Sequence, residues 1–228
     1  MRLAIHDLSA ENLRQMPTLK LVVLDCDGVM FDSREANRAY YGHLREHLGR
    51  PALTEEEVGF VHAHSAPESV PYLFRAWPQD IDRVNDYRAT LDYSPFLRQM
   101  ALAPDLREFL TAVRPPLFTA ISTNRTSTMA AVLDTFALRG YFDLVVTALD
   151  VERPKPHPEA LLKILARFGV QASEAIFVGD TQVDADHAAA VGMPLVAFRS
   201  PTLPAAFHVS NFTEVLRLPP FDSCRRST

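Results

Sequence analysis

The sequence predicts an α/β protein: a parallel sheet with helices on both faces and a small helical domain inserted into it. Short apolar runs of strand length alternate with stretches of helical periodicity, which is typical of a parallel sheet. The interval between the first two runs exceeds 85 residues, whereas a crossover needs only about a dozen. Acidic, hydroxyl and lysine side chains follow the runs directly, which indicates polar chemistry at one edge of the sheet.

Length and composition are those of a globular protein with a substantial core. The chain has 228 residues, 47% of them hydrophobic and 22% charged, enough for one large or two small domains. Its net charge of -5 argues against nucleic acid and anionic membranes as partners. Only Cys26 and Cys224 are present, and no apolar run reaches the ~18 residues of a membrane span. With no signal-peptide pattern either, we expect a cytoplasmic protein without a disulfide framework.

Five apolar runs are predicted to be buried strands, and helices fill the intervals between them. The predicted strands are 19–25, 116–123, 143–148, 175–180 and 194–198. Helical spacing is found at 104–113, 126–138, 158–169 and 183–192. Each of these helices is expected to return the chain to the edge of the sheet where the next strand begins.

Residues 35–100 are predicted to form the inserted helical domain, called the cap here, and residues 1–34 and 101–228 the core. Within the cap, helical spacing punctuated by Pro and Gly is seen at 35–49, 54–64, 67–77 and 79–91, without a convincing strand. At the chain ends, 8–16 is predicted to be a short packed helix and 219–228 a frayed tail.

The carboxyl ends of the predicted strands carry the residues of a candidate active site. In a parallel sheet these ends lie along one edge, where ligands bind. Singly, such residues have ordinary explanations, because Thr and Asn suit a helix N-cap and an acid suits a turn or a helix N-terminus. Their joint occurrence predicts one site. The set comprises Asp25 and Asp27 after the first strand, Thr123 and Asn124 after the second, Lys155 after the third, and Asp180 and Asp184 after the fourth.

These side chains match the needs of a cation and a phosphate. Carboxylates placed together repel one another unless they hold a cation or share protons. Oxygen ligands suit Mg²⁺, and Asp25 and Asp180 are the predicted metal carboxylates. Hydroxyl and ammonium groups complement phosphate oxygens, so Thr123 and Lys155 are predicted to face the phosphate. Alternation along the strand puts Cys26 opposite the two flanking acids, in the core.

Four segments resemble the motifs of the haloacid dehalogenase superfamily, in order and over nearly the whole chain. They are DCDGVMFDS at 25–33, ISTNR at 121–125, RPKPHP at 153–158 and VGDTQVDADHAAAVGM at 178–193. The chain looks most like phosphoglycolate phosphatases and β-phosphoglucomutases, which carry a helical cap. The resemblance implies a Rossmann-like sheet of order 3-2-1-4-5 and a mobile cap inserted after the first motif.

The resemblance also implies a Mg²⁺-dependent phosphatase that forms an aspartyl-phosphate. By this similarity Asp25 is the nucleophile and a metal ligand, and Asp27 is the acid/base whose backbone carbonyl also binds the metal. Asp180 is a further ligand and Asp184 has a supporting role. The implied phosphate-binding residues are Gly28, Thr123, Asn124 and Lys155. The expected substrate is a small phosphorylated metabolite, either phosphoglycolate-like or a sugar phosphate.

Two other functions stay open on the same motifs. A phosphosugar mutase of the β-phosphoglucomutase kind shares the nucleophile, the acid/base and the metal set, although Thr123-Asn124 resembles the phosphatases more than the Ser-Ala of the mutases. A catalytically idle binding protein on the same fold is the other alternative. Dehalogenases lack the second acid and phosphonatases use a cap lysine, and residues 35–100 contain no lysine, so both lose support.

The cap is expected to select the substrate. The stretch after its first helix contains four polar candidates for facing the core, namely His62, His64, Ser65 and Arg75. A histidine there is more often a surface or packing residue than part of a site, so the segment is predicted rather than a particular contact. A monomer and a homodimer are both compatible with the sequence.

Overall fold

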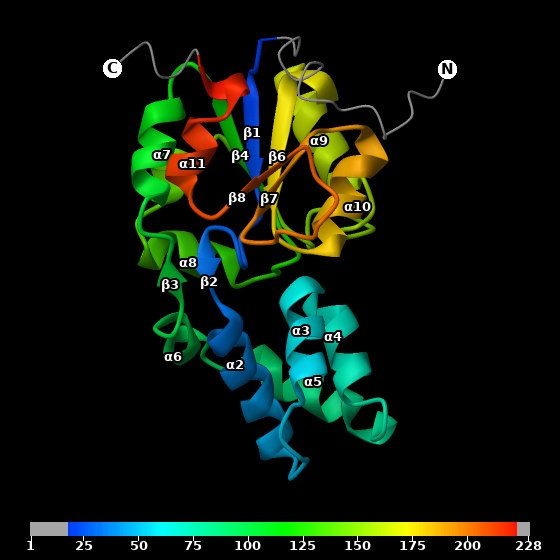
Figure 1. Ribbon diagram of the computed structural model, residues 1–228. Helices are drawn as coiled ribbons and strands as arrows, with labels where there is room; N and C mark the ends of the chain where they lie inside the picture. The colour runs from blue at the N-terminus through cyan, green and yellow to red at the C-terminus, as the bar shows by residue number, and fades with distance from the viewer. Residues whose placement is uncertain (1–17, 223–228) are drawn as a thin grey trace.

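The computed structural model describes residues 18–222 (Figure 1). The predicted N-terminal helix at 8–16 lies outside the described residues. Within 18–222, every helix is too short or too polar to cross a membrane.

A six-stranded parallel sheet lies at the centre of the core (Figure 1), and the predicted strand order is confirmed. The sheet runs β5-β4-β1-β6-β7-β8, which is the expected 3-2-1-4-5 with one further strand at its edge. β1 lies in the middle, with Leu24 opposite Ile121 on one side and Val178 on the other. The chain therefore leaves β1 at the point where strand order reverses, which is where ligands bind in such sheets. The strands are β1 Leu21–Leu24, β4 Phe118–Ser122, β5 Leu144–Val146, β6 Ala175–Gly179, β7 Leu195–Phe198 and β8 Phe207–Val209.

Alternation along the strands gives the sheet two apolar faces, each covered by helices. Val22 and Leu24 join one hydrophobic cluster and Leu21 and Val23 the other. The first cluster contains residues of α7 Leu106–Val113, α8 Met129–Thr135 and α11 Phe212–Leu216; the second contains residues of α9 Glu159–Phe168 and α10 Gln182–Val191. Cys26 is fully buried in the first cluster, as predicted, and burial raises the pKa of its thiol.

Within residues 18–222, three strands were not predicted from the sequence. β8 has three residues and β2 Phe31–Asp32 and β3 Ala101–Leu102 have two each. β2 and β3 pair antiparallel on the two chain segments that lead to and from the inserted helices. These pairings depend on contacts between distant segments, which a local pattern does not contain.

The C-terminal segment is more ordered than the sequence indicated. The predicted frayed tail is wrong for its first residues, because Pro219–Phe221 form a 3-10 turn and Phe221 is fully buried. Its ring lies 5.9 Å from that of Phe109 in α7. Apolar burial against a distant helix overrides the local composition. Three other 3-10 turns occur at Pro78–Asp80, Arg139–Tyr141 and Ala172–Glu174.

The inserted segment forms helices that lie at the carboxyl end of the sheet (Figure 1). They have their own apolar cluster, which includes Tyr41, Leu44 and Phe74. A buried ion pair, Arg45 to Glu57 at 2.6 Å, joins two of them. The division into core and cap at residues 34/35 and 100/101 stays a prediction. The helices are α2 Arg34–His47, α3 Glu55–Ala63, α4 Ala66–Leu73, α5 Ile81–Thr90 and α6 Ser94–Leu97.

Candidate active site

The two acids of the first motif follow directly on β1 and are buried. Asp25 is 6% exposed and Asp27 9%. Gly28 has a φ of +85°, and a Cβ at this position would collide with the Asp180 carboxylate. Glycine is required here for two reasons, the left-handed backbone and the close approach of the acid. Its expected contact with phosphate stays a prediction.

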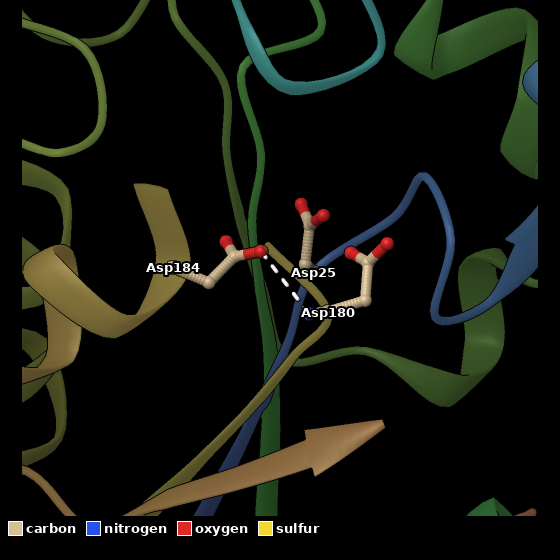
Figure 2. A group of neighbouring side chains, drawn as sticks. All are labelled: Asp25, Asp180 and Asp184. Atoms are coloured by element: carbon tan, nitrogen blue, oxygen red, sulfur yellow. Dashed lines mark hydrogen bonds between the residues drawn. The ribbon is translucent and has the colours of Figure 1, made fainter. Parts of the chain in front are cut away.

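Three carboxylates converge at this edge of the sheet. Asp25 comes from the end of β1, Asp180 from the end of β6 and Asp184 from the first turn of α10 (Figure 2). One ligand oxygen from each lies within 4.8 Å of the others. The pKa of Asp25 is raised to about 8, chiefly by burial; Lys155 opposes this rise, and the charges of Asp184 and Asp180 add to it. This concentration of negative charge in a buried place suits a bound cation.

Lys155 bridges two of these acids. Its Nζ donates to Asp25 Oδ1 and to Asp184 Oδ1, each at 2.7 Å, and its side chain is only 4% exposed. Burial alone would lower the pKa of Lys155, but the two carboxylates raise it above its usual value. The side chain is therefore an ammonium group beside the predicted nucleophile, where it offsets part of the negative charge.

Asp184 and Asp180 differ in how much of each carboxylate is already in use. Asp184 Oδ2 accepts from the Asp180 amide at 3.2 Å (Figure 2). It also accepts from the Thr181 amide at 3.1 Å and from the Thr181 hydroxyl at 2.9 Å. Its other oxygen accepts from Lys155. Asp180 Oδ1 is buried and has no hydrogen-bond partner among residues 18–222. The supporting role fits Asp184, and the free oxygen of Asp180 fits a metal ligand.

Asp27 is held by Arg125, a residue for which no role was predicted. Nε of Arg125 donates to Asp27 Oδ2 at 2.7 Å and Nη2 donates to Oδ1 at 2.6 Å, while the Ser33 hydroxyl also donates to Oδ1. Burial alone would raise the pKa of Asp27, but the arginine holds this pKa below its usual value. The sequence contained one signal for this contact. An arginine, whose planar guanidinium is always charged and can bind a carboxylate through two nitrogens, directly follows Thr123-Asn124 in the second motif.

The second motif organises the loop that carries Lys155. The Asn124 side chain accepts from the Lys155 amide at 3.0 Å and donates to the Lys155 carbonyl at 3.1 Å. It also donates to the carbonyl of Ala63 at the end of α3, at 3.1 Å. Thr123 Oγ1 accepts from the Arg125 amide at 3.1 Å. The structure thus brings Asn124 beside Lys155 through a positioning contact, and direct phosphate binding by either motif residue stays a prediction.

The cap candidates divide into two that reach the site cavity and two that do not. His62 Nε2 lies 3.7 Å from Asp180 Oδ2, and His64 lines the same cavity. Ser65 is buried at the start of α4 and donates its amide to Glu68, and Arg75 pairs with Glu57 at 3.0 Å. The last two are accounted for by contacts within the cap.

His187 is a second residue that the sequence did not single out. It is fully buried on α10, and its Nε2 lies 3.0 Å from the hydroxyl of Ser122 at the end of β4. Burial lowers the pKa of His187 to about 3, so the ring is neutral. The pattern of the helix contained no signal for this contact, because its partner lies on another strand.

A cavity of about 720 Å³ connects the strand ends with the cap. Asp25, Asp27, Thr123 and Lys155 line it from the core and His62 from the cap. Buried acids, a fixed ammonium group and a concave site at the switch point of a parallel sheet define a hydrolase or transferase that acts on an anionic small molecule.

A match to a family model narrows the class of enzyme to which the chain belongs. The model described as haloacid dehalogenase-like hydrolase matches residues 22–198, which include all four motifs. The chain belongs to this family of hydrolases. The resemblance drawn from the motifs is thereby confirmed.

Individual relatives agree with the family. A phosphoglycolate phosphatase from Pseudomonas savastanoi is 31% identical over 189 residues, covering 78% of this chain and 68% of the relative. A ribulose-1,5-bisphosphate 5-phosphatase from Halopiger xanaduensis is 38% identical over 109 residues, 46% of each chain. A solved hydrolase of subfamily IA from Geobacter sulfurreducens is 39% identical with a TM-score of 0.76, covering 88% of this chain and 99% of its own. The prediction of an enzyme of the phosphatase class is confirmed.

Proposed function

We propose that the protein is a Mg²⁺-dependent phosphatase that hydrolyses a small phosphorylated metabolite through an aspartyl-phosphate on Asp25. The contact of Lys155 with Asp25, inside a buried group of acids, is the observation that carries this proposal. Relatives named for phosphoglycolate and for a sugar bisphosphate support a phosphoglycolate-like or sugar phosphate substrate.

The donor set fits a hard divalent cation. Asp25 and Asp180 are the carboxylates proposed to hold Mg²⁺, because the buried Asp180 Oδ1 lacks a partner among the described residues and Asp184 is saturated by other donors. By family resemblance the Asp27 carbonyl completes the protein ligands. Bound Mg²⁺ supplies positive charge that lowers the repulsion between a carboxylate and a phosphate ester.

The residues of the chain account for both steps. A carboxylate oxygen of Asp25 attacks phosphorus, the bond from phosphorus to the ester oxygen breaks, and the departing alkoxide takes a proton from Asp27. Water then attacks phosphorus, its proton goes to Asp27, and the bond to Asp25 breaks to release inorganic phosphate. Lys155 stabilises charge on the transferring group. Gly28, Thr123 and Asn124 are proposed to bind the phosphate oxygens with it.

The domain arrangement belongs to the same proposal. Residues 35–100 are proposed to act as a cap that closes over the core of 1–34 and 101–228, excluding bulk water during the first step. The mutase and the idle binder stay as alternatives, since the contacts in the site do not distinguish a sugar hydroxyl from water as the second acceptor. Cytoplasmic location and the monomeric or dimeric state stay predictions.

Phosphate release from a panel of esters tests the proposal. The panel contains phosphoglycolate, several sugar phosphates and p-nitrophenyl phosphate, each assayed with Mg²⁺, with EDTA and with the Asp25→Asn variant. Release that is lost in EDTA and in the variant is the expected result. Isomerisation of β-glucose 1-phosphate without net release points to the mutase, and no turnover by a folded protein points to the binder; either result overturns the proposal.

A further inference from the structure

The cavity above Asp25 is larger than a phosphoglycolate-sized substrate needs. Its volume is about 720 Å³. A water-sized group takes up roughly 30 Å³ in a liquid, so the nine non-hydrogen atoms of phosphoglycolate occupy roughly 270 Å³. The remaining space extends to the cap, because Asn85 and Arg88 of α5 line the same cavity.

Lysine and arginine supply three cations to the lining of this cavity, and the two on the core side are neutralised by carboxylates. Lys155 pairs with Asp25 and Asp184, each at 2.7 Å. Arg125 pairs with Asp27 at 2.6 Å through a buried, two-pronged contact. Neither the Lys155 ammonium group nor the Arg125 guanidinium is therefore free to bind a distant part of the substrate.

The third cation, Arg88, has no counterion among the described residues. It is partly buried, and its Nη1 donates to Asn85 Oδ1 at 3.2 Å. No carboxylate oxygen of residues 18–222 lies within 4.0 Å of its charged nitrogens. Asp92 lines the cavity four residues further on, but it accepts from the Ser94 amide at 2.9 Å. A guanidinium that faces a substrate cavity without a partner is a ready site for an anion.

Neutral polar groups also line this cavity. They include Asn37, Tyr40, Tyr93, Ser127 and Thr128. Amides and hydroxyls both donate and accept hydrogen bonds, so this wall suits the hydroxyl groups of a sugar or polyol. The aromatic faces of the two tyrosines add apolar contact for its carbon atoms.

We propose that Arg88, oriented by Asn85, is a specificity-determining residue that binds a second anionic group of the substrate. The preferred substrate is then a phosphorylated sugar with a further phosphate or carboxylate at the end remote from the scissile phosphate. One phosphate lies against Asp25 and Lys155 and the other anion against Arg88. This inference rests on the proposed phosphatase function and narrows its substrate class.

Matched substrate pairs test the inference by turnover. Ribulose 1,5-bisphosphate is compared with ribulose 5-phosphate, and glucose 1,6-bisphosphate with glucose 6-phosphate and with 6-phosphogluconate, in the wild type, Arg88→Met and Arg88→Lys. We expect at least one doubly anionic substrate to exceed its monophosphate partner in kcat/KM. In Arg88→Met that ratio falls at least tenfold, mainly through KM, and Arg88→Lys recovers part of it. Whether the phosphate or the carboxylate is preferred identifies the second anion.

Arg83 provides the control on the same helix. Its side chain is 70% exposed, it lies near Asp80 and it does not line the cavity, so Arg83→Met is expected to keep the wild-type ratio. A wild type that prefers none of the doubly anionic substrates, or a ratio that Arg88→Met leaves unchanged, overturns the inference.

Binding to the Asp25→Asn variant separates failure of the inference from failure of the proposed function. Calorimetric titration with both bisphosphates is done with and without the additional Arg88→Met change. Binding at least tenfold weaker without Arg88 supports the anion subsite even if the wild type releases no phosphate from any ester, p-nitrophenyl phosphate included. Equal binding with and without Arg88 overturns the subsite, whether or not the enzyme is a phosphatase.

Discussion

Arg125 determines the state of Asp27, the residue expected to move the proton. Both oxygens of Asp27 accept hydrogen bonds from the guanidinium, and the pKa of the carboxyl is held below its usual value against the effect of burial. An ionised Asp27 is the form that accepts a proton from water in the proposed second step. Arg125 thus lies beside the chemistry, although it was only part of the second motif and no role was predicted for it.

Removing this arginine is predicted to shift the pH dependence. In Arg125→Met the burial of Asp27 persists without the neighbouring cation, so the pKa of Asp27 rises. Because ionised Asp27 is the base of the second step, the acidic limb of kcat is expected to move to higher pH. The profile is measured between about pH 4 and pH 9 on p-nitrophenyl phosphate. The exposed Arg98→Met serves as the control. An acidic limb that stays in place in Arg125→Met contradicts the role given to the ion pair.

Gly28 is predicted to be intolerant of even one methyl group. Gly28→Ala places a side chain against Asp180 and keeps a φ of +85°, a conformation that costs about 1–2 kcal/mol outside glycine before the clash is added. Urea unfolding measures the loss. In the matched control, Gly42→Ala in α2, nothing lies within 4 Å of the new Cβ, and a gain of about 0.5–1 kcal/mol is expected. Equal effects at the two positions contradict the packing argument.

At the scale of elements, the sheet places side chains that are far apart in sequence. Asp25 after β1 and Lys155 after β5 meet at 2.7 Å, and the Asn124 side chain after β4 holds the Lys155 backbone from both sides. The strands β1, β4, β5, β6 and β7 and their order followed from apolar runs and motif resemblance. The short strands β2, β3 and β8 did not, because their pairing is decided by partners far away in the chain.

The end of the described chain is predicted to contribute to stability. Phe221 is fully buried against Phe109, so Phe221→Ala is expected to lower the free energy of unfolding by about 3–5 kcal/mol. Leu149→Ala, at a residue 65% exposed, is the control and is expected to change it by less than about 0.5 kcal/mol. Both are measured by urea denaturation. A negligible loss for Phe221→Ala indicates that the segment is not part of the core in solution.

At the scale of the molecule, the site is completed by contacts between the inserted helices and the sheet. His62 comes within 3.7 Å of Asp180, and Asn124 donates to the Ala63 carbonyl in α3. The cavity is consequently shared, with acids on one side and the tyrosines, histidines and Arg88 on the other. We expect substrate choice to depend on this juxtaposition of the two segments.

Mg²⁺ is predicted to stabilise the whole fold, and more so at high pH. Without a cation, burial raises the pKa of Asp25 to about 8, so the folded state retains a proton that the unfolded chain loses above about pH 4. This contribution to stability is fully present below about pH 4 and is lost as the pH rises through about 8. A cation stabilises the ionised acids, and at a hundredfold excess over Kd it adds about 2.7 kcal/mol.

Thermal unfolding with Mg²⁺ and with EDTA measures this effect. The rise in Tm caused by Mg²⁺ is expected to be larger at pH 8 than at pH 5 and to be abolished by Asp180→Asn, which weakens the proposed ligand set. Asp186→Asn, at an exposed acid on α10 outside the group, is the control. A shift that survives in Asp180→Asn, or that ignores pH, contradicts the proposed cation site.

The parallel sheet, the inserted helices, the family and the acids at the strand ends could all be predicted from the amino-acid sequence. Apolar runs, helical periodicity and short motifs are local properties of the chain, so they can be recognised without knowing which distant segments are in contact. Four features could be seen only in the folded protein: Arg125 binds Asp27, His187 contacts Ser122, Asp180 Oδ1 has no partner among residues 18–222, and Arg88 lines the same cavity. These contacts join segments far apart in the chain, so their distances and burial exist only once the sheet and the inserted helices have packed together.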